Sequence, residues 1–512
     1  MSKKLVAVID IGSINARLKI FEIGAKGKPK EVESCSRFIS LGAQGYTSGM
    51  IQPAQVTELC TCLNMFDVKC KEYHVSKVFC MATSAFREAG NRDVVLDQIK
   101  VRTGFDINVL DNSIERHYHN TAIKETMPDF VELIKSGTMI LDIGAGSMQA
   151  TVYDNSEFVF SQNTVLGSLR VSDLLSDIIN RTTHYEDVLE EFISQDLNDY
   201  HNVEPKGIVY KSLIAFGGEI GFLKTLSGKD RNSNTVMTKQ EFMNVYEYLL
   251  KTRASDLTLN NSIPASVAPL LLPSALIIRN MLEYTGLDMI YLPTASLSDG
   301  VIYNYCFNEM NLKPTIKTEN DLICAARNIA KRYKVDKKHI EFVERMSLEI
   351  FDASKSISGL NDRHRLYLRL ASILHEVGKF VDAKNHNNAS YALIRYTDLI
   401  GLSNDELNII GLVVRLYPTE DPYSDNYYSS LPSDKKVVIS KLTSMLRLAD
   451  ALDASHKQKV KGCSAQLMHS VLTVSCDVTS DMSFEEWSFE HRALIFEEVL
   501  GITPHLKLKR RL

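Results

Sequence analysis

Hydrophobic and polar residues alternate at the start of the chain in the pattern of a β-hairpin. A hydrophobic run at residues 5–9 is followed by the turn Gly12-Ser13 and by a second alternating run at residues 16–23, and a period of two is that of a β-strand. Helical periodicity then alternates with short strand-like runs, in the order 54–75, 77–81, 91–103 and 106–110. This alternation of helices and strands predicts an α/β lobe.

The opening pattern returns further along the chain. A strand at residues 138–141 leads into the glycine-rich turn of residues 142–147, and a strand resumes at residues 148–153. Both copies consist of a strand, Asp-Ile-Gly, a turn and a second strand, which predicts two similar lobes that face each other across a cleft. Later strands at residues 213–216 and 289–292 complete the second lobe.

From about residue 312 to residue 455 the pattern changes to long amphipathic helices, which predict a separate helical domain. An alternating run, a helix and a basic tail follow, at residues 471–478, 490–500 and 507–512. The predicted fold is therefore α/β, with two lobes, an all-α domain and a small C-terminal α+β unit. The expected domains are residues 1–128, 129–308, 309–460 and 461–512.

Length and composition narrow the possible classes of protein. A chain of 512 residues is too long for one hydrophobic core, and 45% hydrophobic with 24% charged residues is ordinary for a globular protein. The formal net charge is −5. A polyanionic ligand must then be met by a local basic cluster or by backbone N–H groups, and a protein that coats nucleic acid is disfavoured.

The N-terminal residues, the longest apolar stretch and the cysteines together predict a cytoplasmic protein. Ser2-Lys3-Lys4 is followed directly by a strand-like run, which leaves no room for a signal peptide. The most apolar later stretch, residues 267–282, is interrupted by two prolines and Arg279, so we expect a buried helix and no membrane span. The nine cysteines are scattered without a repeated CxxC at zinc-ligand spacing, which favours reduced, structural thiols.

The segment Asp10-Ile11-Gly12-Ser13 combines an acidic residue with a tight turn. The glycine and serine can expose backbone N–H groups to a phosphate while the carboxylate holds Mg2+ or orients a water molecule. For a single copy, a hairpin turn in which Asp10 accepts local N–H bonds is the preferred explanation. The second copy at Asp142-Ile143-Gly144-Ala145-Gly146-Ser147 favours a pair of phosphate-binding loops.

Several segments together resemble the exopolyphosphatase and guanosine pentaphosphate phosphohydrolase (Ppx/GppA) family of the actin-like ATPase superfamily. Residues 8–15 and 142–147 are similar to its two phosphate motifs, and residues 109–116 to the segment that ends in the catalytic glutamate. The most specific match is residues 82–92, which are similar to the family pattern A-T-S-A-x-R-x-A-x-N. The resemblance implies two actin-like (ribonuclease H-like) lobes in a cytoplasmic protein that forms a homodimer.

The resemblance also implies the chemistry. Glu115 would be the general base, Arg87 would clamp the phosphate, and Asp10, Asp142 and Glu115 would hold Mg2+. The implied phosphate contacts are Gly12, Ser13, Asn15, Gly144, Ala145, Gly146, Ser147, Gly217 and Gly218. Without the motif context, Glu115 could be an exposed glutamate at a helix start and Arg87 a surface ion pair with Glu88 or Asp93.

The implied activity is hydrolysis of the terminal phosphate of inorganic polyphosphate, with guanosine pentaphosphate or tetraphosphate as alternative ligands and no nucleic acid or membrane as partner. The phosphate loops depart from the family pattern at Ile14, where the family has Asn, and at Met148-Gln149, where it has Thr-Glu. Val267-Ala268-Pro269 also replaces an Arg-Ala-Asp triplet. A regulatory protein that binds polyphosphate or a guanosine alarmone without hydrolysis is therefore an alternative, and an actin-like sugar or acetate kinase is another.

The helical part resembles the HD-type domain that longer family members carry. His339, His375 and Asp450 stand at the matching places, but Glu376 replaces the Asp of the His-Asp pair, and the later histidine cluster is reduced to His386-Asn387-Asn388. We therefore expect a structural or channel-forming domain in which these polar groups are packed and hydrogen-bonded between helices. Residues such as Lys379 or the tail at 507–511 are candidates to line a basic channel.

Overall fold

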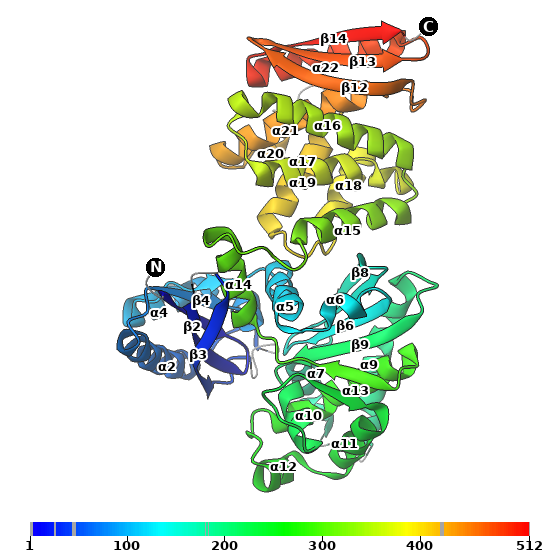
Figure 1. The fold of residues 1–512 in the computed structure, drawn as a ribbon. Helices are drawn as coiled ribbons and strands as arrows, with labels where there is room; N and C mark the ends of the chain where they lie inside the picture. The colour runs from blue at the N-terminus through cyan, green and yellow to red at the C-terminus, as the bar shows by residue number, and fades with distance from the viewer. Residues whose placement is uncertain are drawn as a thin grey trace. The chain divides into compact units, whose positions relative to one another are not determined.

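A computed structural model describes residues 4–24, 27–42, 48–179, 181–182, 184–419 and 424–510. The chain divides into two compact units, Met1–Lys317 and Thr318–Leu512, here called the first and the second unit (Figure 1). The first unit contains two mixed sheets with their helices, and the second is mainly helical. Mixed α/β structure followed by many helices agrees with the predicted fold class.

The first sheet has the strand order β3-β2-β1-β4-β5. The predicted hairpin is confirmed, because β1 pairs antiparallel with β2 from Lys4 opposite Ile23 to Ile11 opposite Ala16. The strand β3 was not predicted; its sequence is largely exposed and carries few hydrophobic residues. The strands are β1 (Lys4–Ile11), β2 (Asn15–Ile23), β3 (Pro29–Phe38), β4 (Lys77–Ala82) and β5 (Asn108–Val109).

Alternation along β1 builds a core on each face of this sheet. Ile9 and Ile11 point into a cluster with helices α2 and α4, whereas Val6 and Val8 point into a second cluster with α14. Successive strand residues face opposite sides, so a fully hydrophobic strand indicates a sheet covered on both faces. The helices of this lobe are α2 (Pro53–Glu72), α3 (Ser84–Glu88), α4 (Arg92–Thr103), α5 (Asn112–Thr126) and α14 (Leu297–Glu309).

The second sheet repeats the beginning of the first and has the order β10-β11-β9-β6-β7-β8. Its central hairpin pairs Ile143 with Met148. The two turns close in the same way, since the Gly12 N–H donates to Asn15 O and the Gly144 N–H donates to Ser147 O, both at 2.9 Å. The strands are β6 (Gly137–Ile143), β7 (Met148–Asp154), β8 (Glu157–Thr164), β9 (Tyr210–Gly217), β10 (Thr235–Thr238) and β11 (Met289–Leu292).

Helices cover the second sheet and include the predicted buried helix. Pro269 lies in a short 3-10 turn (Ala268–Leu270) before α13, whose hydrophobic residues form much of the lobe's core. No helix in the described part of the chain is long and apolar enough to cross a membrane. The helices are α6 (Phe130–Leu133), α7 (Ser168–Leu174), α8 (Ser176–Ile179), α9 (Tyr185–Val203), α10 (Ile220–Leu226), α11 (Lys239–Lys251), α12 (Ala254–Asn261) and α13 (Leu271–Thr285).

Close packing of α14 on α5 depends on a glycine. A Cβ atom built on Gly300 would overlap the carbonyl oxygen of Tyr118 in α5. We expect Gly300→Ala to lower the free energy of unfolding by about 1–3 kcal/mol, because overpacking forces backbones apart. A lowered melting temperature, measured by circular dichroism, would confirm this. Gly286→Ala is not a suitable control, because Gly286 has a positive φ of 67° and alanine would be strained there. Gly24→Ala, which meets no neighbouring atom within 4 Å, serves instead.

The second unit consists of a helical bundle and a small sheet with the order β12-β13-β14. The predicted strand and helix at 471–478 and 490–500 are confirmed as β13 and the C-terminal part of α22. The basic tail forms β14 as far as Arg510, and Arg511 lies outside the described residues. The sheet elements are β12 (Val460–Met468), β13 (Val471–Val478), α22 (Ser483–Leu500) and β14 (Thr503–Arg510).

The bundle helices of this unit are α15 (Thr318–Arg332), α16 (Lys337–Ser358), α17 (Asp362–Leu374), α18 (His386–Arg395), α19 (Asn404–Leu416), α20 (Asn426–Ser429) and α21 (Ser433–Ala451). A 3-10 turn, Val377–Phe380, follows α17.

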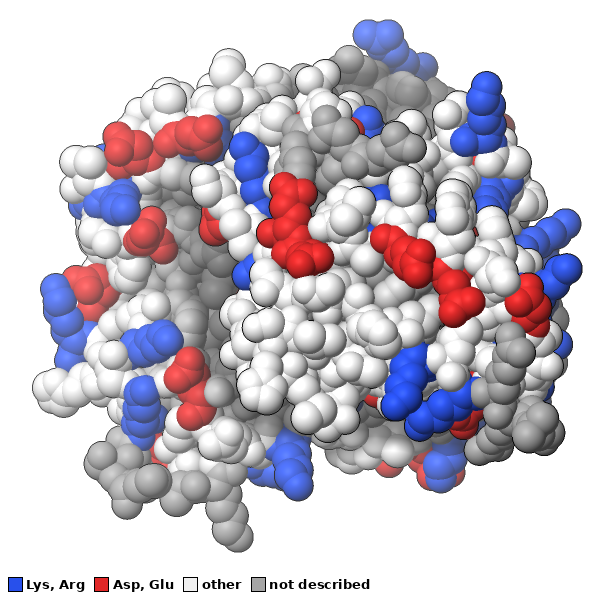
Figure 2. All heavy atoms as spheres, turned by 90° about the horizontal axis from the view of Figure 1, so that it is seen from above, with Lys and Arg blue, Asp and Glu red and all other residues white. Residues whose placement is uncertain are grey.

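Acidic and basic side chains are interspersed on the face drawn in Figure 2. A mixed surface of this kind does not by itself attract a polyanion, so a basic site for such a ligand has to be built locally.

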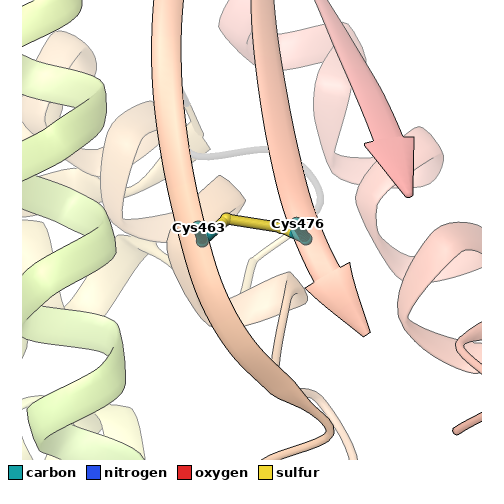
Figure 3. Close-up of a disulfide and its surroundings, with 2 residues drawn as sticks. All are labelled: Cys463 and Cys476. Carbon is teal, nitrogen blue, oxygen red and sulfur yellow. A yellow bond between two sulfur atoms is a disulfide. The ribbon is translucent and has the colours of Figure 1, made fainter. Parts of the chain in front are cut away.

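The expectation of reduced thiols is wrong for one pair of cysteines. Cys463 in β12 lies directly opposite Cys476 in β13, and the two form a disulfide across the strands (Figure 3). The residues are 13 positions apart in sequence, but the hairpin brings their Cα atoms to 4.3 Å. Spacing along the chain carries no sign of this pairing. Cys60 and Cys62, the closest pair in sequence, are buried thiols of α2.

Candidate active site

The ends of three strands meet around a cavity of about 630 Å³ in the first unit. Asp10 and Asp142 are the second-to-last residues of β1 and β6, Gly217 is the last residue of β9, and all three line this cavity. A smaller adjoining cavity of about 130 Å³ shares Asp10 with the larger one and is also lined by Glu115. The two glycine turns and the predicted base therefore converge on one region of the first unit.

Most predicted site residues line one or both cavities, while three do not. The lining residues among them are Asp10, Gly12, Ser13, Asn15, Glu115, Asp142, Gly144, Ala145, Gly217 and Gly218. Arg87, Gly146 and Ser147 line neither of these cavities. Ser147 instead accepts a hydrogen bond of 2.6 Å at its Oγ from Nη2 of Arg116. The second loop thus offers Gly144 and Ala145, and neither Gly146 nor its serine side chain, to the cavities.

Gly217 is required where β9 passes β6. Its φ is 151°, and a Cβ atom there would overlap the carbonyl oxygen of Ile143. Only glycine tolerates both conditions, since an L side chain rarely adopts this conformation. The motif Gly217-Gly218 therefore lets two strand ends approach closely at the wall of the cavity.

Glu115 is buried and held by an arginine. It lies in the first turn of α5 and is 8% exposed, so it is not an exposed glutamate at a helix start. Arg87 Nη1 donates to Glu115 Oε2 at 2.8 Å and to Leu110 O at 2.9 Å. The alternative of an Arg87–Glu88 surface pair is wrong, because Glu88 accepts a hydrogen bond of 2.5 Å from Arg170. Arg87 therefore orients the Glu115 carboxylate.

Asp142 is a buried carboxylate that pairs with two side chains of α5. It is 3% exposed, and its Oδ2 pairs with Arg116 Nη1 and lies 2.7 Å from His119 Nδ1. Burial alone would raise the pKa of Asp142, but Arg116 and His119 outweigh it and hold the pKa at about 2. Asp142 is therefore ionised at any physiological pH.

His119 is a cavity residue that the sequence interpretation missed. It lines both cavities. Burial lowers the pKa of His119, yet the contact with Asp142 raises it above the ordinary histidine value. The spacing in the sequence could have identified His119, because Glu115 and His119 are four residues apart on α5 and such residues share one face of a helix.

The aspartates at the strand ends fit a small divalent cation. Asp142 Oδ1 is buried and has no hydrogen-bond partner among the described residues. Asp10 lines the same cavity, and burial raises its pKa above the ordinary value although Arg17 and His119 oppose the shift. Carboxylate oxygens are the ligands that Mg2+ prefers. Glu115 fits less well as a third ligand, since Oε2 is occupied by Arg87.

Cationic side chains line the larger cavity and were also missed. They are Arg17, Lys19, Lys224 and Arg231. Lys224 Nζ donates to Ser233 O at 3.0 Å, and burial lowers the pKa of Lys224 to about 8. Glu31 and Asp299 also line this cavity and pair with Lys19, so Arg17, Lys224 and Arg231 are the cations that suit a ligand with several negative charges. These residues come from β2, α10 and the segment after α10, which no local motif connects.

The residues that depart from the family pattern differ in whether they lie at the cavities or in the core. Ile14 lines the smaller cavity, where it offers no hydrogen bond. Met148 is fully buried in the core of the second lobe. Gln149 is also buried, and its Nε2 donates to Ser161 Oγ of the neighbouring strand β8. Met148 and Gln149 line neither cavity, whereas Ile14 and Val267, which stands where the family has Arg, both line the smaller one.

Glu219 is a second buried carboxylate at the smaller cavity. It is 2% exposed, accepts a 2.9 Å hydrogen bond from Ser168 Oγ at Oε1, and has no partner for Oε2 among the described residues. Burial raises its pKa to about 7, with Ser168 opposing. Its ionised form is therefore disfavoured in the folded protein.

We expect Glu219→Gln to stabilise the first unit at pH 8. The pKa of Glu219 is higher in the folded state, so the folded state holds more protons between the ordinary pKa of 4.5 and about 7, and stability falls as pH rises through that range. Replacing the carboxylate by an amide is expected to raise the free energy of unfolding by up to about 3 kcal/mol at pH 8 and by almost nothing at pH 4. Hydrogen exchange of the β9 amides at both pH values measures the difference; equal effects at both would contradict the assignment.

Comparisons with known proteins agree with this geometry. A model described as the Ppx/GppA phosphatase family matches residues 20–309, and a model of its domain III matches residues 323–498. A guanosine-5'-triphosphate,3'-diphosphate pyrophosphatase of Aliivibrio fischeri (strain MJ11) is 20% identical over 491 residues, which are 93% of this chain and 92% of the relative. The protein of the same name from Pseudoalteromonas translucida is 21% identical over 513 residues, 97% of this chain and 95% of the relative.

A crystal structure of an exopolyphosphatase from Cytophaga hutchinsonii has a TM-score of 0.52 and 20% identity, and the match covers 60% of this chain and 98% of that one. It shows that the matched part of this chain has the fold of that structure. The family model spans more than half of the 512 residues. The chain therefore belongs to the Ppx/GppA phosphatase family.

Proposed function

We propose that this protein is an exopolyphosphatase that releases the terminal orthophosphate of inorganic polyphosphate by Mg-assisted attack of water, with guanosine pentaphosphate as a second substrate. The observation that carries the proposal is the convergence of both glycine turns, led by Asp10 and Asp142, and of Glu115 on adjoining cavities. The printed names of relatives, an exopolyphosphatase and guanosine-5'-triphosphate,3'-diphosphate pyrophosphatases, support the same class of substrate.

In this proposal Glu115 is the general base. Its carboxylate faces the smaller cavity while Arg87 holds one oxygen, which leaves the other oxygen to orient a water molecule towards a terminal phosphate. A positioned base commonly contributes about 100-fold to 10,000-fold in rate. The phosphate would be held from two sides by backbone N–H groups of the two turns other than those of Gly12 and Gly144, which close the turns.

Asp10 and Asp142 are the residues that would hold Mg2+, with Asp142 Oδ1 as the unpartnered oxygen. When bound, the ion neutralises charge on the phosphate oxygens. Arg17, Lys224 and Arg231, which line the larger cavity, would contact the phosphates that precede the terminal one. His119, anchored by Asp142, supplies a further positive charge at the junction of the two cavities.

Release of orthophosphate from medium-length polyphosphate with Mg2+ tests the proposal directly. Hydrolysis from the chain end by the purified protein is the expected result. Phosphorylation of a small metabolite with ATP would instead identify a kinase and overturn the proposal. A parallel assay with guanosine pentaphosphate compares the two substrates.

A regulatory protein that binds polyphosphate or an alarmone is the second candidate. Ile14 favours it, because this residue removes a hydrogen-bonding side chain from the wall of the smaller cavity. Tight binding of polyphosphate without turnover in the same assay would select this candidate.

From the resemblance alone, we also propose a cytoplasmic homodimer whose second unit is an HD-like domain. Light scattering after size-exclusion chromatography measures the assembly. The expected molar mass is about twice the 57.6 kDa of one chain.

A further inference from the structure

The smaller cavity contains a carboxyl group that the proposed hydrolysis does not use. Glu219 follows the turn Gly217-Gly218 and directly precedes α10 of the second lobe, whereas Glu115 lies on α5 of the first lobe. Both glutamates line the smaller cavity. Two carboxyl groups therefore enter one cavity from different lobes.

Only one oxygen of Glu219 is held by the protein. Ser168 Oγ, which is itself fully buried, donates to Glu219 Oε1 at 2.9 Å. Oε2 is buried and has no hydrogen-bond partner among the described residues. Buried polar atoms are almost always hydrogen-bonded, and the exceptions require an explanation. Oε2 therefore requires a partner that the described protein atoms do not supply.

No cation holds Glu219 in its ionised form. Burial raises the pKa of Glu219 to about 7, while the hydrogen bonds from Ser168 and from its own backbone N–H oppose the shift. The charged side chains that face the same cavity from other elements are Asp10, Glu115, His119 and Arg231.

None of these four groups is among the causes of the shifted pKa of Glu219. On the adjoining helices, Arg170 of α7 is paired with Glu88, and Lys224 of α10 donates to Ser233 O. The neutral carboxylic acid of Glu219 is therefore well populated at neutral pH.

The neutral and the ionised form offer different contacts to a phosphate. An ionised carboxylate can only accept hydrogen bonds, whereas a carboxylic acid has one O–H that donates. Phosphate oxygens are acceptors and carry negative charge. The neutral form of Glu219 can therefore bind a phosphate, and the ionised form repels it.

We propose that Glu219 is a phosphate-binding residue whose neutral carboxyl group donates a hydrogen bond from Oε2 to an oxygen of the terminal phosphate in the smaller cavity. The inference rests on the proposed function, because it takes the end of a phosphoanhydride chain as the ligand of this cavity. It requires binding alone, so it applies with or without turnover. No covalent bond forms or breaks in this contact.

The contact explains why a destabilising group lies at this position. Glutamine is expected to make the first unit more stable at pH 8, so the carboxyl group does not serve stability there. Ionisable groups with perturbed pKa values in a cavity are typical of functional sites. Because only the neutral form binds, binding above pH 7 takes up about one proton from the solvent.

Calorimetric titration with tripolyphosphate and Mg2+ at pH 6 and pH 8 tests the proposal. All proteins in this test also carry Glu115→Gln, so that the ligand is not hydrolysed during the titration. Glu219→Gln keeps a hydrogen-bond donor at every pH, and the titration of the ligand itself is common to both proteins. The affinity of the protein with Glu219, relative to Glu219→Gln, is expected to fall about 10-fold from pH 6 to pH 8, because the neutral fraction falls by that factor around a pKa of about 7.

Three further variants separate this role from a structural one. Glu219→Ala has no donor and is expected to bind about 10-fold to 100-fold more weakly than Glu219→Gln at both pH values. Ser168→Ala removes a hydrogen bond that lowers the pKa of Glu219, so the loss of binding should move to higher pH. Glu247→Gln changes an exposed glutamate of α11 and is the matched control, with the pH dependence of its parent.

The number of protons taken up is measured by repeating the titration at pH 8 in buffers with different heats of ionisation. Protein with Glu219 is expected to take up about one proton more than Glu219→Gln. An equal ratio of affinities at both pH values would refute the role of Glu219 alone. Tighter binding by protein with Glu219 than by Glu219→Gln at pH 8 would show that the ionised form is the one used, which overturns the inference. If none of the proteins binds tripolyphosphate, the proposed function fails together with it.

Discussion

Replacing Glu115 by glutamine is expected to lower the rate of orthophosphate release from polyphosphate by about 100-fold to 10,000-fold. Glutamine has the shape of glutamate and can still accept a hydrogen bond from Arg87, so the local structure should persist. The amide cannot take a proton from the attacking water. The change therefore removes the base and leaves the phosphate-binding turns unaltered.

The measurement is the steady-state rate with saturating polyphosphate and Mg2+, together with binding of polyphosphate to the same variant. A lower rate with unchanged binding identifies a role in the chemical step. Glu132→Gln changes an exposed glutamate of α6 in the first unit and is the matched control. Full activity of Glu115→Gln would shift the role of base to His119, which lies one helical turn away.

The second large effect concerns stability. We expect Asp142→Asn to lower the free energy of unfolding of the first unit by about 3–5 kcal/mol, the usual cost of breaking a buried ion pair. Arg116 is 2% exposed and would keep a buried charge without its carboxylate. His119 would lose the partner that raises its pKa.

The effect of Asp142 also depends on pH in a defined direction. Its folded-state pKa is about 2, below the ordinary 3.8, so the contribution is present above pH 3.8 and is lost as pH falls through about 2. Hydrogen exchange of the β6 amides at pH 7 measures the destabilisation. Asp129→Asn, at an exposed position, should change stability by less than about 0.5 kcal/mol. An equally small effect of Asp142→Asn would show that the ion pair contributes little.

The local elements of the first unit could be predicted from the sequence. Alternating residues at 5–9 and 16–23 identified the hairpin, and the repeated Asp-Ile-Gly identified its counterpart in the second lobe. These features are local, because a strand's period and a turn's glycine act within a few residues. The position of Asp10, Asp142 and Glu115 at adjoining cavities was predicted through the family motifs.

Pairings between distant segments could not be predicted in this way. The contacts of Asp142 with Arg116 and His119, and the cations of the larger cavity, join residues from different elements. The disulfide between Cys463 and Cys476 depends on the register of a hairpin whose first strand was not predicted. Each partner alone is an ordinary residue of its type.

The sequence by itself determined the family, the two repeated turns and the identity of the acidic residues that lead them. Only the tertiary structure decided that Arg87 holds Glu115, that Gln149 lies away from the cavities, and that the Nε2 atoms of His339 and His375 lie close to two carboxylates of the second unit. The physical reason is that turns and strands arise from neighbouring residues. The charge and lone-pair environment of a buried group is set instead by side chains that folding brings from distant parts of the chain.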